Sequence, residues 1–319
     1  MKIFSIIGPT GVGKTSFALE LAWKILQNKS YTGIDLISAD SRQVYQGLEI
    51  ISGADIPLEF KLNHDQNLIY PFYTNGQVNL HGVSIIAPDQ EWSVTHFQDL
   101  AWEVIKLAKQ KQRLVMVIGG TGLYHDQLLN IDPVLRVKPD NQVRQEAKFL
   151  ELEALQIWAQ KVNPVRYELL NHSDQNNPRR LIRVIEIGHK NLDKKTDNSF
   201  LKLEQIYIGL HQDLVLIEAK IKNRVLERFS NGAIQEVRRL QKKYANWSLP
   251  AFSALGTSEL SQYLNGLFSK DECVALWTLH ELQYAKRQLT WWKNRDVFWF
   301  EIGNHEWKLQ AFTYILSIC

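Results

Sequence analysis

One segment near the start of the chain constrains its fold more than any other. It directly follows the apolar run 2–7, and it reads Gly8, Pro9, Thr10, Gly11, Val12, Gly13, Lys14 and Thr15. A glycine-rich loop between a buried strand and a helix is typical of a phosphate-binding loop. Glycines let backbone N–H groups approach an anion, Lys14 adds positive charge, and the hydroxyl of Thr15 suits Mg²⁺. We therefore expect these eight residues to bind a di- or triphosphate.

The composition is that of an ordinary globular protein. The chain has 319 residues, 45% hydrophobic and 22% charged, which is enough for one large or two modest domains. Its two cysteines, Cys273 and Cys319, are too few for a disulfide framework, and its nine histidines show no spacing typical of metal ligands. Neither a leader peptide nor an apolar run of ~20 residues is apparent, so we expect a soluble, cytoplasmic protein with no membrane partner.

Strands and helices alternate in the first third of the chain. Apolar runs predict strands at 2–7, 34–38 and 114–118, and a 3.6-residue apolar spacing predicts a helix around 97–108. This order indicates an α/β fold with a P-loop NTPase-like parallel sheet flanked by helices. The polar loops 8–15, 39–45 and 119–124 each follow a strand, where ligands bind in such sheets.

From residue 132 the pattern changes. One helix is expected from Pro139-Asp140 through about Trp158, and another from Asn177-Pro178. No strand signal appears before about residue 200. We therefore expect an all-helical insertion domain at 132–200, ending in a polar linker at 191–199, within a core domain formed by 1–131 and 201–319.

The remainder of the chain returns to the α/β pattern. We expect a strand at 205–210, a helix at 214–229 and a final strand at 296–302. Ser269 and Glu272 form a capping box for a long helix that runs to about Trp292. The stretch 59–80 has weak periodicity and is expected to be an irregular insertion.

Two side chains in the loops after strands are candidates for chemistry. Asp40 could hold Mg²⁺ or act as a general base, or it could simply cap a turn. Thr121 stands in a Gly-Gly-Thr-Gly segment and offers a hydroxyl to a phosphate or a leaving group. Gly-Gly-Thr alone is a weak signal, and its value comes from sharing a sheet edge with the phosphate-binding loop.

Two cationic clusters suit nucleic acid. Arg179, Arg180 and Arg183 lie on one side of a predicted helix, where they could bind backbone phosphates or form a solvated face. The run 286–295 interleaves four cations with Trp291 and Trp292, as single-strand binders do, although one tryptophan could be a core residue.

Five segments in the same order resemble the tRNA isopentenyltransferases, the IPP transferase family. They are 8–15, 40–45, 119–124, 180–183 and 286–291. The resemblance runs over nearly the whole chain. It implies transfer of a dimethylallyl group from dimethylallyl diphosphate to N6 of the adenine next to the tRNA anticodon, position 37, with release of diphosphate.

The resemblance also assigns roles to residues. Asp40 would take the proton from adenine N6, and Lys14, Thr121 and Arg224 would stabilise the departing diphosphate with Mg²⁺ at Thr15. The segments that contact tRNA in this family correspond here to Asp40, Ser41, Arg42, Gln43, Thr121, Arg144, Arg179, Arg180, Arg183, Lys286, Arg287, Gln288, Thr290, Trp291 and Arg295. The helical insertion would grip the anticodon stem. We expect a monomer with no obligate protein partner.

The chain departs from the family pattern in four places. The segment 51–54 lacks a lysine where Ala54 stands, Thr257 replaces an aromatic residue, Lys220 replaces arginine, and the stretch 59–80 is longer. Three other functions remain possible from the sequence: prenylation of free adenine nucleotides, a small-molecule P-loop kinase, or an RNA-binding protein without turnover. The cationic clusters favour an RNA substrate over a mononucleotide.

Overall fold

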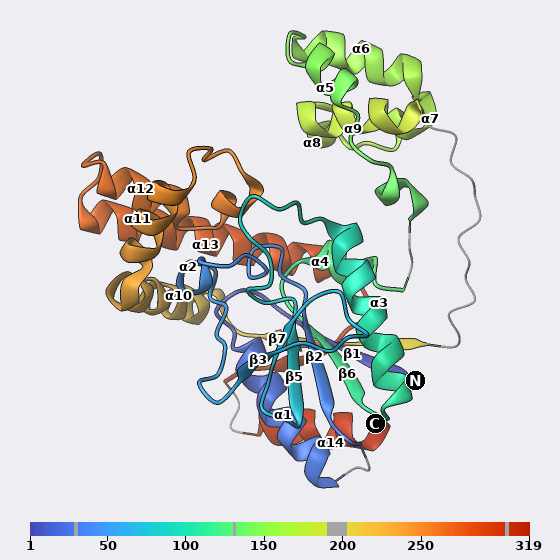
Figure 1. Cartoon of the computed structure of the whole chain (residues 1–319), viewed down its shortest axis with the longest axis vertical. Coiled ribbons are helices and arrows are strands. Elements are labelled where there is room, and N and C mark those ends of the chain that lie inside the picture. Colours follow the sequence, from blue (N-terminus) through green and yellow to red (C-terminus); the bar gives the residue numbers. More distant parts are fainter. Residues whose placement is uncertain (29–30, 130–131, 190–202, 304–305) are drawn as a thin grey trace. The chain divides into compact units, whose positions relative to one another are not determined.

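The computed structural model describes residues 1–28, 31–129, 132–189, 203–303 and 306–319 (Figure 1). The chain divides into two compact units. The core unit comprises Met1–Leu129 and Lys202–Cys319, and the helical unit is Asn130–Leu201. The expected linker 191–199 lies outside the described residues. Among the residues described, no helix combines the length and apolar character that crossing a bilayer requires.

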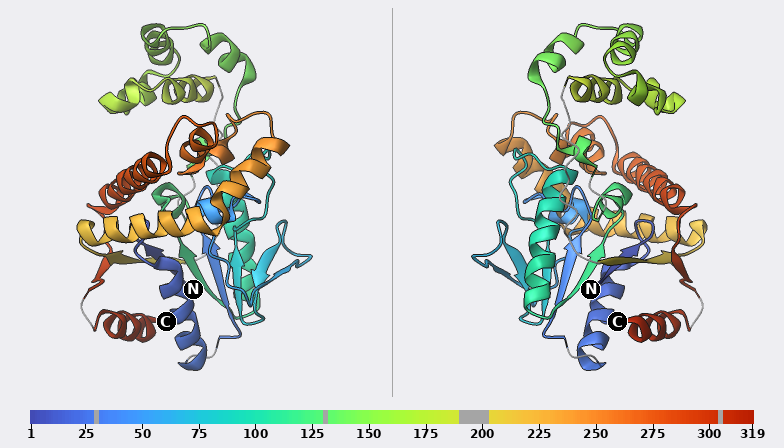
Figure 2. Two further views of the ribbon diagram at one scale, coloured as in Figure 1. Left: turned by 90° about the vertical axis from the view of Figure 1, so that its left-hand side faces the viewer. Right: turned by 90° about the vertical axis from the view of Figure 1, so that its right-hand side faces the viewer.

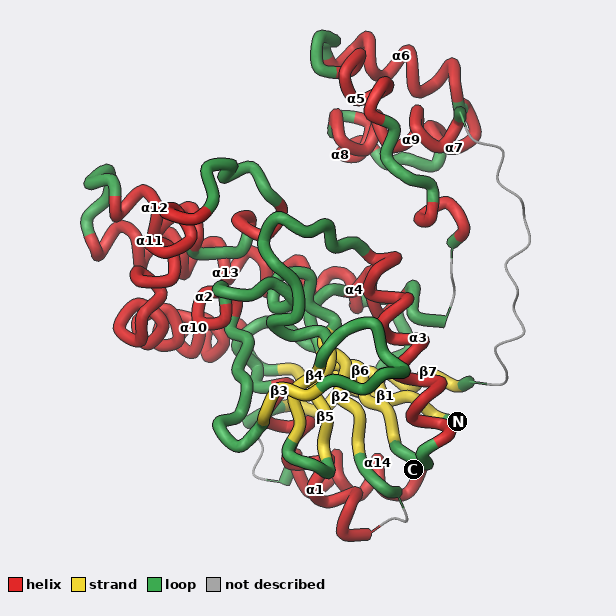
Figure 3. Tube along the Cα trace, viewed as in Figure 1, coloured by secondary structure: helices red, strands yellow, loops and turns green. Residues whose placement is uncertain are grey.

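The core unit is built on one eight-stranded sheet with the order β3-β4-β5-β2-β6-β1-β7-β8 (Figure 3). The strands are β1 Lys2–Ile7, β2 Ile34–Ser38, β3 Lys61–Asn63, β4 Phe72–Thr74, β5 Val78–His81, β6 Leu114–Ile118, β7 Glu204–His211 and β8 Phe298–Glu301. All pairs from β5 to β8 are parallel, whereas β3, β4 and β5 pair antiparallel. The predicted α/β class is confirmed, with a mixed sheet in place of a wholly parallel one.

The prediction that 59–80 is irregular is wrong. This stretch forms β3, β4 and the start of β5. Strands of three or four residues are too short to give a periodic signal, and backbone pairing at the sheet edge decides their conformation.

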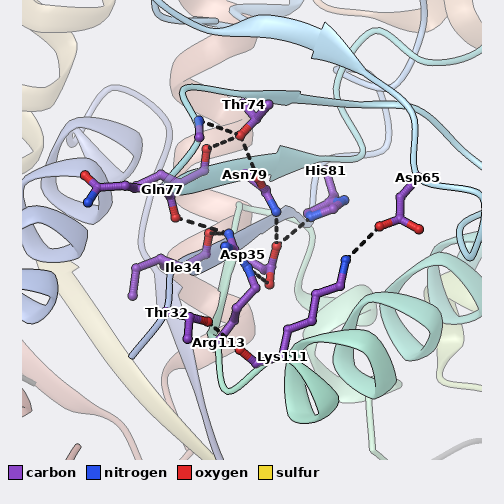
Figure 4. A network of polar contacts seen from close by, with 12 residues as sticks. Thr32, Ile34, Asp35, Asp65, Thr74, Gln77, Asn79, His81, Lys111 and Arg113 are labelled. Atoms are coloured by element: carbon purple, nitrogen blue, oxygen red, sulfur yellow. Dashed lines mark hydrogen bonds and ion pairs between the residues drawn. The ribbon is translucent and has the colours of Figure 1, made fainter. Parts of the chain in front are cut away.

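A buried polar network fastens β5 to β2 (Figure 4). The Asp35 carboxylate accepts a hydrogen bond from Asn79 Nδ2 at 2.7 Å and pairs with His81 Nε2 at 3.0 Å and Arg113 Nε at 2.8 Å. Burial alone would raise the pKa of Asp35, but His81 and Arg113 together hold it below its ordinary value. Asp35 is therefore a satisfied structural carboxylate that fixes the edge of the sheet.

Three helices cover the sheet. They are α1 Lys14–Asn28, α3 Val94–Gln110 and α14 Trp307–Ile318. On one face α1 and α14 share a core with the strands, where the rings of Phe17 and Phe312 stack at 5.4 Å. Figure 2 shows α3 on the opposite face. The helices on both faces bury the central strands, as is usual for parallel sheets.

The remaining helices of the core unit stand near the carboxyl ends of the strands. They are α2 Glu49–Ser52, α4 Gly122–Asp126, α10 Leu214–Arg228, a π-helical turn Phe229–Ala233, α11 Ile234–Lys243, a 3₁₀ turn Pro250–Ser253, α12 Thr257–Leu264 and α13 Lys270–Trp292. The predicted capping box is confirmed, because Ser269 and Glu272 cap α13 reciprocally. The long α13 packs along α10.

The helical unit contains a 3₁₀ turn Pro133–Arg136 and five helices: α5 Asn141–Ala147, α6 Leu152–Val162, α7 Pro164–Glu168, α8 His172–Gln175 and α9 Pro178–Gly188. As predicted, α9 begins with Pro178 after the capping residue Asn177. The single helix expected from Asp140 to Trp158 is wrong. The chain leaves the helix after Ala147, so that α5 and α6 can both pack against α9.

Candidate active site

Three loops meet at one edge of the central sheet. Because β2, β6 and β1 are neighbours, the loops 39–45, 119–124 and 8–15 follow adjacent parallel strands. Parts of all three line a cavity of about 330 Å³, which α10 and α13 complete. The convergence expected from the sequence is therefore confirmed.

The phosphate-binding loop needs its glycines. Gly8, Gly11 and Gly13 have φ angles of 144°, 81° and 90°, which side chains rarely adopt. A Cβ on Gly8 would lie 2.4 Å from the carbonyl oxygen of Leu210, so the loop also packs tightly on β7. The helix α1 begins at Lys14 and points its N-terminal N–H groups toward the loop.

Lys14 is bound by its own loop. Its Nζ donates to the carbonyl oxygens of Gly8 at 3.0 Å and Pro9 at 2.8 Å. Burial, followed by repulsion from Arg224, lowers the pKa of Lys14 to about 7. An anion in the cavity would favour the charged ammonium and raise the pKa of Lys14 again. The site therefore suits a negatively charged ligand.

Asp40 lines the cavity and also holds a turn. Its Oδ1 accepts hydrogen bonds from the backbone N–H groups of Arg42 at 2.8 Å and Gln43 at 3.3 Å. The turn-capping function considered from the sequence is thus present, and it coexists with a position beside the phosphate-binding loop.

Thr121 lies where the loops after β2 and β6 touch. Its backbone N–H donates to the carbonyl oxygen of Ala39 at 3.1 Å. Its hydroxyl oxygen is buried, and its side chain interacts with Tyr284, which lines the cavity, whereas Thr121 itself is not among the lining residues.

Helix α13 supports the phosphate-binding loop. Gln288 Oε1 accepts a hydrogen bond from the Thr10 N–H at 2.7 Å, and Glu281 Oε2 accepts one from Thr10 Oγ1 at 3.2 Å. Arg224, on α10, donates through Nη2 to Thr10 Oγ1 at 2.6 Å and to Glu281 Oε2 at 2.7 Å. Gln288, expected at the RNA interface, is therefore buried against the loop as well as lining the cavity.

The sequence reasoning missed several lining residues, and the most polar of them are Arg228, Glu281, Tyr284 and Asp55. A signal was available for Glu281 and Tyr284. Glu281, Tyr284 and Gln288 occupy positions i, i+3 and i+7 of α13, which places them on one helix face.

The remainder of the cationic run 286–295 is divided between surface and core. Lys286, Arg287 and Thr290 are exposed, and Arg287 also lines the cavity. Trp291 is 41% exposed and covers Gly122, whereas Trp292 is fully buried. Arg295 stacks on both indoles and pairs with Asp126. The prediction that one tryptophan belongs to the core is confirmed.

In the helical unit, two of the predicted RNA-binding arginines pair with a buried carboxylate and two do not. Arg144 and Arg183 share the buried carboxylate of Glu186, and Arg183 Nη2 also donates to the Val137 carbonyl at 2.7 Å. Arg180 pairs with Asp174 at 3.0 Å but stays 59% exposed, and Arg179 is exposed as well. The last two therefore remain the better candidates for an external partner.

The sheet, the glycine-rich loop after β1 and the cationic cavity beside it define a P-loop-like α/β protein. Comparisons with known families agree. A family model described as IPP transferase matches residues 43–295, and one described as isopentenyl transferase matches 1–82. The chain belongs to the IPP transferase family, which confirms the resemblance found in the sequence.

Similar proteins cover almost the whole chain. A tRNA dimethylallyltransferase of Halothermothrix orenii is 31% identical over 95% of this chain and 88% of its own length. One from Bacillus cytotoxicus is 30% identical over 98% of this chain and 94% of its own length.

Two solved structures share the fold. The full-length tRNA isopentenylpyrophosphate transferase of Bacillus halodurans is 28% identical with a TM-score of 0.66, covering 99% of this chain and 96% of that one. A eukaryotic dimethylallyltransferase described as acting on tRNA has a TM-score of 0.77, covering 99% of this chain and 78% of that one. At 21% identity it supports the fold alone.

Proposed function

We propose that this chain transfers a dimethylallyl group from dimethylallyl diphosphate to N6 of adenine 37 of tRNA, next to the anticodon, and releases diphosphate. The observation that carries the proposal is the meeting of the phosphate-binding loop, Asp40 and Arg224 around one cavity. The relatives named tRNA dimethylallyltransferase support the same chemistry.

The phosphate-binding loop and two cations hold the leaving group. When the bond between allyl C1 and oxygen breaks, its electron pair leaves with the diphosphate. Backbone N–H groups of residues 8–15, the Lys14 ammonium and the Arg224 guanidinium stabilise the charge that develops there. Thr121, which directly follows the lining residue Gly120, is a further donor for this anion in the proposal.

Asp40 prepares the nucleophile. An exocyclic aromatic amine is a weak nucleophile, so orientation and proton removal both matter. The N6 nitrogen forms a bond to C1, and its proton passes to the Asp40 carboxylate. The adenine must leave its stack to reach the cavity, which costs a few kcal/mol in an anticodon loop.

Magnesium fits this site through Thr15. Its hydroxyl lines the cavity at the start of α1, and an oxygen donor suits this hard cation. Among the described residues no group of three or more His, Cys, Asp or Glu side chains could hold a metal. Thr15 would hold Mg²⁺ in this proposal, and the ion would supply positive charge to the departing diphosphate.

The tRNA is bound through exposed cations of both units. Lys286, Arg287, Arg179 and Arg180 contact backbone phosphates in this proposal, and the helical unit grips the anticodon stem. The enzyme works in the cytoplasm as a monomer. The residues Ser41, Arg42 and Gln43 after β2 hold the target nucleotide near Asp40.

An acceptor comparison tests the proposal. The purified chain is incubated with dimethylallyl diphosphate and Mg²⁺, together with total tRNA, AMP or ATP, and the digested products are separated by mass. Dimethylallyl adenosine from tRNA alone is the expected result. Product from AMP or ATP, with none from tRNA, would favour a transferase that acts on free nucleotides.

A further inference from the structure

Arg228 is a buried cation at the wall of the candidate active site. It ends α10, one helical turn after Arg224, and only 8% of its surface is exposed. Its guanidinium nevertheless lines the cavity together with Lys14 and Arg224. A buried guanidinium is expensive unless charges of opposite sign surround it.

The turn at 51–54 shapes the position of this guanidinium. Gly53 closes α2 with φ 64°, and a Cβ there would lie 1.9 Å from Arg228 Nη2. The Arg228 side chain therefore packs directly on the backbone of this turn. The turn carries no cation of its own at 51–54, and the cation packed on it is Arg228 of α10.

One carboxylate serves both arginines. Glu281 Oε1 accepts from Arg228 Nη1 at 3.0 Å, and Glu281 Oε2 accepts from Arg224 Nη2 at 2.7 Å. Arg224 Nε is buried with no hydrogen-bond partner in the described ranges of the chain. Glu281 thus orients two guanidinium groups without neutralising both.

The whole cavity has an excess of positive charge. Five cationic side chains line it, against three carboxylates: Lys14, Arg42, Arg224, Arg228 and Arg287 against Asp40, Asp55 and Glu281. An anion with several negative charges would relieve this imbalance, and guanidinium groups are well suited to phosphate oxygens.

We propose that Arg228 is a further binding residue for the phosphate oxygens of the substrate, held in place by Gly53 and by the carboxylate that it shares with Arg224. The identification of those oxygens as the diphosphate of dimethylallyl diphosphate rests on the proposed function. Phosphates of the RNA backbone offer the same chemistry, so the experiment distinguishes the two sources.

The test replaces Arg228 with methionine, which keeps much of its length and removes its charge. Inorganic pyrophosphate with Mg²⁺ is titrated into each protein by calorimetry, and KM is measured separately for dimethylallyl diphosphate and tRNA. We expect Arg228→Met to weaken pyrophosphate binding about tenfold or more, as loss of one charge-assisted hydrogen bond does. The KM for dimethylallyl diphosphate should rise similarly, with the KM for tRNA within about twofold.

Two further variants control for charge and folding. Lys222→Met removes an exposed charge from the same helix and should leave all three values unchanged. Arg228→Lys should fall between the wild type and Arg228→Met. If Arg228→Met does not fold, Arg228→Gln keeps a donor for Glu281 without the charge.

Two results would contradict this role of Arg228. A folded Arg228→Met with wild-type pyrophosphate affinity and both KM values unchanged would overturn the proposal and leave Arg228 as a structural partner of Glu281. A rise in the tRNA KM alone would overturn the assignment to the diphosphate and favour an RNA phosphate. The pyrophosphate titration needs no turnover, so it reports on Arg228 even if the wild type transfers no prenyl group.

Discussion

The Asp40 side chain both stabilises a turn and lines the cavity. Its Oδ1 holds the backbone N–H groups of Arg42 and Gln43, and these residues also line the cavity. A substitution at Asp40 can therefore disturb the turn, the chemistry or both. Separating the two effects requires a pair of variants.

Asp40→Asn retains an oxygen that can accept the two backbone hydrogen bonds but cannot act as a base. We expect it to bind tRNA and pyrophosphate like the wild type and to lose about 10²-fold or more in turnover. Asp40→Ala should lose turnover to a similar extent, with a lower Tm as well. Binding, single-turnover rate and thermal unfolding are measured for both. Near-wild-type turnover in Asp40→Asn would remove Asp40 from the role of base.

The lowered pKa of Lys14 predicts coupling between protons and ligand. With a pKa of about 7, most of the Lys14 population is neutral at pH 8. A bound diphosphate favours the ammonium, so binding raises this pKa and takes up protons from the buffer. Pyrophosphate affinity should therefore fall as pH rises above 7.

Calorimetry in buffers of different ionisation enthalpy measures this proton uptake. Lys14→Arg is the control, because a guanidinium stays charged throughout this pH range. At pH 8 the wild type should take up more protons than Lys14→Arg on binding pyrophosphate. Equal uptake by the two proteins would show that Lys14 is already fully charged.

At the scale of elements, α13 determines how the site is held together. The helix was predicted correctly from its capping box, and its cationic end was recognised as a cluster. Sequence could not show that Gln288 turns inward to Thr10, because that contact joins residues 278 positions apart. Long-range contacts of this kind depend on packing that no local pattern encodes.

The same dependence on long-range packing explains why the short strands and one helix break were predicted wrongly. The strands 2–7, 34–38 and 114–118 were predicted correctly because long apolar runs mark buried parallel strands. The short strands β3 and β4 gave no such signal, because tertiary pairing decides them. Likewise, the break between α5 and α6 follows from packing against α9 rather than from a local proline or glycine.

Gln288→Ala tests whether α13 supports the phosphate-binding loop. The variant leaves the Thr10 N–H without its acceptor, which should cost about 1–3 kcal/mol of stability and weaken pyrophosphate binding. Gln283→Ala changes an exposed residue of the same helix and should have little effect. Thermal unfolding and pyrophosphate titration are compared for the two variants. Indistinguishable results would mean that the loop holds its shape without α13.

At the scale of the whole molecule, the helical unit is the part of the chain to which we assign recognition of RNA. It has its own small core, in which Val143, Leu155 and Leu181 are buried. Its exposed arginines lie outside that core, so they are available for charge-based recognition. A free nucleotide substrate would need no such second unit.

Arg180→Ala and Arg287→Ala test the RNA-binding role proposed for each of the two units. Each should weaken tRNA binding and reduce the magnitude of the slope of log K against log salt by roughly 0.7–0.9. Asp174→Asn releases Arg180 from its ion pair and should bind tRNA at least as well as the wild type. Filter binding over a range of salt concentrations measures all three. An unchanged salt slope in Arg180→Ala would exclude Arg180 from the interface.

The most direct measurement follows two labels in one substrate. Dimethylallyl diphosphate carrying ¹⁴C in the allyl group and ³²P in the terminal phosphate is incubated with the chain, Mg²⁺ and tRNA. The ¹⁴C should appear on the adenine next to the anticodon, while all ³²P is released as diphosphate. Appearance of ³²P on any acceptor would mean that the cavity transfers phosphate, and the assignment of Asp40 and the loop to prenyl transfer would be wrong.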